Sequence, residues 1–116
     1  MSKKKVLRFR KKYEESILSR KKRTTIRLRT RLKVGDDVII RAGKEDIANA
    51  VITSVKTTKI KDLTDEHAIK DGFNSREELI NELESIYGKL QEDTEVKILE
   101  FDLTCKRPRK EGKKGS

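Results

Sequence analysis

The strongest helical pattern in the chain lies between residues 75 and 88. Ser75 and Glu78 form a capping box at its start, and Gly88 supplies a stop signal at its end. Between them, apolar residues occur at positions i, i+4, i+7 and i+8, which share one face of a helix. These residues are Leu79, Leu83, Ile86 and Tyr87. The pattern predicts an amphipathic helix here.

Two shorter helices are predicted elsewhere. Residues 11–19 carry apolar side chains at helical i, i+4 spacing and follow a short apolar stretch. Either Asp62 or Thr64 can cap a second short helix, which we expect to end near Gly72.

Residues 24–33 alternate between apolar and polar side chains. Ile26, Leu28 and Leu32 share one face, and this period of two predicts a half-buried strand. The opposite face is a row of mainly cationic residues, namely Thr25, Arg27, Arg29, Arg31 and Lys33. We therefore expect the strand to carry a cationic outer row.

Four further strands complete the predicted elements. Apolar or alternating segments at residues 6–9, 38–41, 47–59 and 94–103 are separated by turn or helix signals. A chain of 116 residues fits one domain. The elements together predict an α+β domain with two to three short helices.

Charge is distributed unevenly along the chain, whose formal net charge is +10. Residues 8–33 hold twelve basic and two acidic side chains, whereas residues 34–105 hold nine basic and seventeen acidic ones. We expect residues 1–5 to be a basic extension, residues 6–105 the folded domain, and residues 106–116 a disordered basic tail. Such a concentration of positive charge favours an anionic partner.

Several classes of protein do not fit the sequence. It has no apolar run of the roughly 18 residues that a membrane helix needs, and no signal-peptide pattern, so we expect a cytoplasmic protein without membrane contact. Cys105 and His67 are the only cysteine and histidine, too few for a zinc site of the usual kind. We expect no metal, no cofactor and a monomeric chain.

The leading functional prediction is RNA binding through the basic segment. Guanidinium groups bind phosphate oxygens through two hydrogen bonds and stack on bases. The residues predicted to contact nucleic acid are Arg20, Lys21, Arg23, Arg27, Arg29 and Arg31. The alternative is a solvated face that balances the acidic remainder. Recognition by base stacking is disfavoured, because aromatic residues make up 4% of the chain and most occupy positions typical of a core.

Six short segments together resemble the ASCH domain family. They are residues 7–9, residues 17–19, the run Lys22-x-x-Thr25-x-Arg27, the turn Lys33-x-Gly35-Asp36-x-Val38, residues 71–73 and residues 98–101. The resemblance extends over residues 6–103. It implies a small PUA-like mixed β-barrel that binds RNA.

The family motif Gly-x-Lys-x-x-Glu-x-Arg is changed at two positions in this chain. Arg20 stands where glycine is common, and Thr25 stands where glutamate is common. The second change resembles the bacterial N4-acetylcytidine amidohydrolases of the same family. That resemblance implies a catalytic set of Lys22 as base, Thr25 as nucleophile and Asp71 in place of a glutamate that is one methylene longer.

Ordinary structural roles also fit these three residues. Thr25 suits a strand as a β-branched residue, Lys22 suits a solvated surface, and Asp71 suits the end of a helix. Residues three apart on a regular strand face opposite sides, so Lys22 and Thr25 can meet only if the chain bends between them. We expect a base or nucleoside to bind in a cleft between the arginine strand and Asp71. A third possibility is a protein adaptor that uses the acidic helix at residues 75–87.

Overall fold

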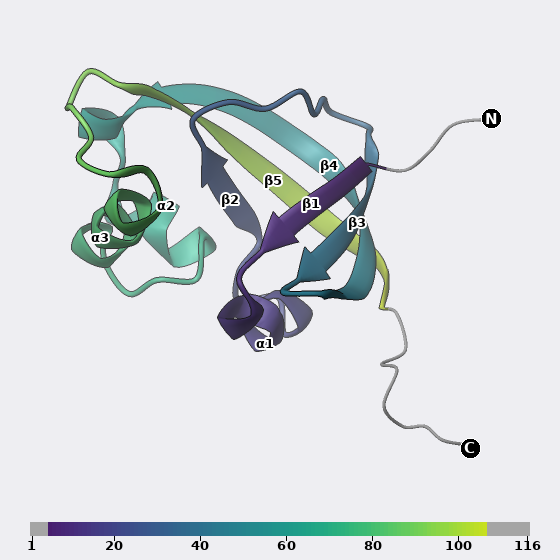
Figure 1. The fold of residues 1–116 in the computed structure, drawn as a ribbon. Helices are drawn as coiled ribbons and strands as arrows, with labels where there is room; N and C mark the ends of the chain where they lie inside the picture. The colour runs from purple at the N-terminus through teal and green to yellow at the C-terminus, as the bar shows by residue number, and fades with distance from the viewer. Residues whose placement is uncertain (1–4, 107–116) are drawn as a thin grey trace, which may run out of the picture.

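The computed structural model describes residues 5–106, and its five strands form a single mixed sheet (Figure 1). The strands are β1 (Lys5–Phe9), β2 (Thr24–Arg27), β3 (Asp37–Ala42), β4 (Glu45–Lys59) and β5 (Glu95–Lys106). Their order is β1-β3-β4-β5-β2; β1 runs parallel to β3, and all other neighbouring pairs are antiparallel. The sheet curls into a half-barrel, so the edge strands β1 and β2 approach each other. Arg27 of β2 spans this gap by donating a 2.6 Å hydrogen bond from Nη2 to the carbonyl of Arg8 on β1.

Short helices occupy two places around the half-barrel (Figure 1). The connection from β1 to β2 contains η1 (Lys11–Tyr13) and α1 (Glu14–Leu18). The connection from β4 to β5 contains η2 (Ile60–Asp62), α2 (Asp65–Lys70) and α3 (Arg76–Tyr87). Thr64, rather than Asp62, caps α2, because its hydroxyl accepts a hydrogen bond from the His67 amide. The Ser75 hydroxyl accepts from the Glu78 amide and caps α3, as predicted.

The apolar side chains form two separate buried clusters. The first fills the curled sheet and includes Leu7, Ile17 and Ile40; the second joins β2 and the start of β5 to α2 and α3 through residues such as Ile26 and Leu83. Removal of this apolar surface from water is the main force that holds the elements together. The two clusters meet beside β2.

The predicted strand at residues 24–33 is wrong beyond Arg27. β2 pairs with β5 only over Thr24–Arg27, and residues 28–36 form a connection to β3. The sheet order explains this, because β2 lies at one edge and is separated from β3 by β5 and β4. The chain must therefore leave its pairing with β5 and cross to the far part of the sheet before β3 begins. Arg29 and Arg31 therefore lie on the connection, and the cationic strand face is absent.

The predicted basic extension and basic tail fall almost wholly outside the described residues, which begin at Lys5 and end at Lys106. Within residues 5–106, no helix combines the length and the apolar character needed to cross a membrane.

Candidate functional site

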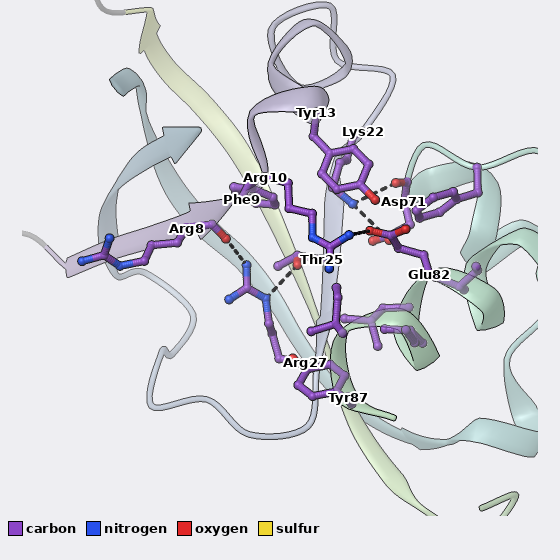
Figure 2. A pocket seen from close by; sticks show the side chains of 15 residues that line it. Arg8, Phe9, Arg10, Tyr13, Lys22, Thr25, Arg27, Asp71, Glu82 and Tyr87 are labelled. Atoms are coloured by element: carbon purple, nitrogen blue, oxygen red, sulfur yellow. Dashed lines mark hydrogen bonds and ion pairs between the residues drawn. The ribbon is translucent and has the colours of Figure 1, made fainter. Parts of the chain in front are cut away.

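A pocket of about 270 Å³ opens where the two apolar clusters meet, between the end of β1, β2 and α3 (Figure 2). Its wall is mostly apolar or aromatic, with a smaller number of charged and polar groups, a composition typical of ligand sites. The apolar and aromatic lining residues are Phe9, Tyr13, Ile26, Phe73, Leu79, Leu83, Ile86 and Tyr87. The charged and polar ones are Arg8, Arg10, Lys22, Thr25, Arg27, Asp71 and Glu82.

Lys22 and Asp71 form a buried ion pair in this wall. Each residue is 4% exposed, and the Lys22 Nζ atom lies 3.0 Å from the Asp71 Oδ2 atom. The same Nζ atom also donates a 2.9 Å hydrogen bond to the Asp71 backbone carbonyl. Asp71 is the C-cap of α2, so the end of this helix fixes both oxygen acceptors.

Three aromatic rings surround the Lys22 amine. Its Nζ atom lies 5.0 Å from the ring centre of Tyr13, 5.5 Å from that of Phe73 and 5.7 Å from that of Phe9. These distances are within cation–π range. The expectation that the aromatic residues are mainly core residues is therefore incomplete, because four of the five, these three and Tyr87, also line the pocket.

Burial shifts both members of the ion pair toward their neutral forms. Loss of solvation lowers the pKa of Lys22, although the Asp71 carboxylate opposes the shift. Loss of solvation likewise raises the pKa of Asp71, opposed by Lys22 and by a hydrogen bond from Thr24. A lysine in such surroundings becomes a neutral amine, and hence a base, at a lower pH than an exposed lysine does.

Thr24 and Thr25 have different hydrogen-bond partners. Thr24 donates a 2.8 Å hydrogen bond from Oγ1 to Asp71 Oδ1, whereas Thr25 Oγ1 accepts a 2.9 Å hydrogen bond from Arg27 Nε and lines the pocket. Lys22 precedes the first residue of β2, so the alternation of a regular strand does not apply to it. Lys22, Thr25 and Asp71, the three predicted catalytic residues, therefore line one pocket.

Arg27 belongs to the pocket wall and not to an outer cationic row, which corrects the prediction. Its guanidinium bonds to Thr25 and to the Arg8 carbonyl, and it lies 5.4 Å from the ring centre of Phe9. Burial lowers the pKa of this guanidinium below its ordinary value. Arginine nevertheless keeps its charge in proteins, so a cation faces the pocket.

The other predicted RNA-binding residues do not form one row. Arg20, Lys21 and Arg23 are exposed in the turn before β2, and Arg29 and Arg31 are exposed on the connection to β3. Arg20 and Arg23 line a shallow depression with residues of β4 and β5. Arg20 pairs there with Asp102 at 3.2 Å. Its φ angle of 68° lies in the left-handed region that favours glycine, the residue common at this position in the resembled motif.

Glu82 is a pocket residue that the sequence pattern did not predict. It projects from α3, and its side chain is only 14% exposed (Figure 2). Arg10 Nη1 lies 3.3 Å and Lys12 Nζ lies 3.4 Å from its carboxylate oxygens. Burial alone would raise the pKa of Glu82, but the Tyr13 hydroxyl and these two cations lower it. Its position beside Leu83, within the apolar stripe of α3, was the available signal.

The residues usually considered for metal binding have other roles. His67 accepts a hydrogen bond at Nδ1 from the Thr64 amide and so completes the α2 cap, and Cys105 is exposed on β5. Within residues 5–106, no three or more His, Cys, Asp or Glu side chains are grouped as metal ligation requires.

Comparisons with known proteins agree with this fold. Solved structures with 17–20% sequence identity include a protein from Enterococcus faecalis V583, with a TM-score of 0.74 over 91% of this chain and 79% of that one, and an ASCH domain from Lactobacillus crispatus JV V101, with a TM-score of 0.61 over 79% and 70%. An ASCH protein from Zymomonas mobilis, 13% identical, gives a TM-score of 0.65 over 84% of this chain and 65% of that one. A search of curated proteins gave no match.

These structural similarities confirm the predicted α+β fold with a PUA-like mixed β-barrel, which in this chain is a curled half-barrel. The sequence itself matches the ASCH domain over residues 3–104, almost the whole chain. This chain belongs to the ASCH domain family.

Proposed function

We propose that the pocket binds a nucleoside and hydrolyses the amide of an N4-acylated cytidine such as N4-acetylcytidine. The observation that carries the proposal is the buried Lys22–Asp71 pair, which shares one pocket with the hydroxyl of Thr25. The similarity of the Lys22-x-x-Thr25-x-Arg27 run to the amidohydrolase branch of the family points to Lys22 and Thr25, and the same resemblance puts Asp71 in place of the branch's glutamate.

Thr25 is the nucleophile in this proposal. A threonine hydroxyl is a weak nucleophile until a neighbouring base removes its proton. Lys22 is suited to that role because burial lowers the pKa of its amine. Arg27 donates to Thr25 Oγ1, and because that oxygen only accepts in this contact, its own proton stays available to the base.

The reaction consumes one water molecule and releases acetate and cytidine. Thr25 Oγ1 attacks the acetyl carbonyl while its proton passes to Lys22, the carbon–nitrogen bond breaks, and the departing N4 nitrogen takes that proton from Lys22. Water then attacks the threonine ester, Lys22 accepts one water proton and returns it to Thr25 Oγ1 as the ester bond breaks, and the released acetic acid ionises to acetate.

Asp71 supports Lys22 in this scheme. Its side chain is shorter than the glutamate of the amidohydrolases, and its two carboxylate oxygens bond to Lys22 and Thr24. It therefore holds the Lys22 amine in place and offsets the ammonium charge as that charge forms. The leaving nitrogen is then protonated by Lys22.

The experiment is incubation of the full chain with N4-acetylcytidine, with released cytidine and acetate measured by chromatography. Turnover by the wild type that is lost in Lys22→Met supports the proposal, and the exposed neighbour provides the control Lys21→Met. Absence of turnover by the wild type at both neutral and mildly alkaline pH would contradict it.

A second candidate function is RNA binding by the surface around the pocket. The exposed cations Arg20, Lys21, Arg23, Arg29 and Arg31 support it, although they lie on two separate segments. Phosphate contacts of this kind release counterions and make affinity fall steeply with salt. The double variant Arg29→Ala with Arg31→Ala should weaken binding to a single-stranded RNA and reduce the salt slope by up to about 1.4, or 0.7 for each lost contact. An affinity independent of salt would refute this function.

A further inference from the structure

The pocket contains two carboxylates whose surroundings differ. Each carboxylate oxygen of Asp71 is held by a protein partner, because Oδ1 accepts from Thr24 at 2.8 Å and Oδ2 lies 3.0 Å from Lys22 Nζ. Both partners are themselves buried. Asp71 therefore has little capacity left to bind a ligand.

Glu82 is held by two flexible surface side chains and by the half-buried hydroxyl of Tyr13. Its partners Arg10 and Lys12 are 47% and 57% exposed, and their contacts of 3.3 and 3.4 Å are longer than a strong charge-assisted hydrogen bond. Exposed ion pairs of this kind contribute little and exchange readily with water. The Glu82 carboxylate, in contrast, is largely buried in the pocket wall. An ionised carboxylate has about four acceptor sites, so Glu82 can accept a hydrogen bond from a ligand while these contacts remain.

The charges in the pocket define what this ligand must present. Cations on its wall, Lys22 and Arg27, can only donate hydrogen bonds while charged. Glu82 remains ionised at neutral pH, since its pKa lies below the ordinary value, and an ionised carboxylate can only accept. A complementary ligand therefore carries a hydrogen-bond donor on the side facing α3 and carbonyl acceptors on the side facing β2.

We propose that Glu82 is a specificity-determining residue that accepts a hydrogen bond from the exocyclic N–H of an acylated amino base. This inference rests on the proposed function and narrows its substrate class to N-acylated nucleosides that keep one N–H. A buried acceptor left without its donor is costly, so the site should reject analogues without that N–H.

The test compares N4-acetylcytidine with N4-acetyl-N4-methylcytidine, which lacks the N–H. Turnover and calorimetric affinity are measured for the wild type, Glu82→Met and Glu82→Gln, with Glu77→Met on an exposed position of α3 as the control. The wild type and the control should prefer N4-acetylcytidine to the methylated compound, with the same ratio of turnover and of affinity in both proteins. Glu82→Met should lower this ratio by about tenfold or more, and Glu82→Gln, which keeps an oxygen acceptor, should lower it less.

The possible outcomes separate the role of Glu82 from the proposed hydrolysis. If both proteins turn over N4-acetylcytidine and prefer it to the methylated compound by the same ratio in the wild type and in Glu82→Met, the methyl group is rejected sterically. This result overturns the inference about Glu82 but leaves hydrolysis intact. Binding with a ratio that depends on Glu82, but without turnover, supports the inference and refutes hydrolysis. Neither binding nor turnover of the two compounds overturns both.

Discussion

Thr24 and Asp71 are 47 positions apart in the sequence, and the Thr24 Oγ1 atom donates a 2.8 Å hydrogen bond to the Asp71 Oδ1 atom. This contact joins the start of β2 to the end of α2 and sets the orientation of a buried carboxylate. The other oxygen, Oδ2, then faces Lys22. The position of the amine in the pocket thus depends on a threonine that does not line it.

Replacement of Thr24 by valine should change the titration of Asp71. Valine has nearly the same shape but cannot donate, so the pKa of Asp71 should rise and the free energy of unfolding should fall by about 1–3 kcal/mol. Serine at this position keeps the hydroxyl and should retain most of both properties. Carbon-detected NMR titration of Asp71 and urea unfolding measure the two effects. An unchanged Asp71 pKa in Thr24→Val would contradict this role.

Removal of the Lys22 amine should make stability depend more strongly on pH. Burial raises the pKa of Asp71 in the folded chain above its unfolded value, so the stabilising effect of its protonated form is complete below the unfolded pKa and is lost as pH rises through the folded pKa. Lys22→Met removes the cation that opposes this shift, and breaking a buried pair costs about 3–5 kcal/mol when the remaining group is charged. The stability deficit of Lys22→Met relative to the wild type should grow from about pH 4 to about pH 8.

Urea unfolding at several pH values tests this dependence, with the exposed Lys21→Met as the matched control. The control should follow the wild type at every pH. A deficit of Lys22→Met that stays constant or shrinks as pH rises would show that Lys22 does not stabilise an ionised Asp71.

Gly72 and Gly35 offer a matched pair of substitutions. Both have a φ angle of 93°, which costs an alanine about 1–2 kcal/mol in either place. An added Cβ at Gly72 would lie 3.2 Å from the Cβ of Lys22, whereas at Gly35 nothing lies within 4 Å. Gly72→Ala should therefore destabilise the chain more than Gly35→Ala and displace Lys22. Equal losses in urea unfolding, with equal turnover of N4-acetylcytidine, would show that Lys22 is not held by this contact.

Arg27 should stabilise both the half-barrel and the pocket. Lysine keeps the charge but has a single nitrogen, whereas Arg27 reaches Thr25 and the Arg8 carbonyl from two separate nitrogens, so Arg27→Lys should lower the free energy of unfolding by about 1–3 kcal/mol. Arg29→Lys, on the exposed connection, should change it by less than about 0.5 kcal/mol. The comparison is made by thermal or urea unfolding, and similar values for both variants would argue against the bridge between β1 and β2.

The sequence pattern predicted most elements because their signals are local. The Ser75 cap of α3 and the alternation in the strands depend on neighbouring residues, and the structure has most of them where expected, although the Glu78 carboxylate accepts from the Asn74 amide and not from the Ser75 amide of the predicted capping box. The end of β2 depends on pairing partners distant in the sequence, so the pattern could not reveal it. Leu28 and Leu32 continue the apolar alternation, yet they pack against different clusters from a connecting segment.

The pocket could be predicted only in part for the same reason. The motif identified Lys22, Thr25 and Asp71, and all three line the pocket. Glu82 was missed because a polar residue on an amphipathic helix is normally solvated, and only the packing of α3 against residues 10–13 shows that it is buried.

The most direct test of the central claim is the rate at which cytidine is released from N4-acetylcytidine by the wild type, Thr25→Ala and Thr53→Ala. Thr53 is an exposed threonine of β4 outside the pocket. We expect steady release by the wild type and Thr53→Ala, and a loss of at least about 10³-fold in Thr25→Ala. Release that survives in Thr25→Ala, or no release by the wild type, would contradict the claim that Thr25 accepts the acyl group.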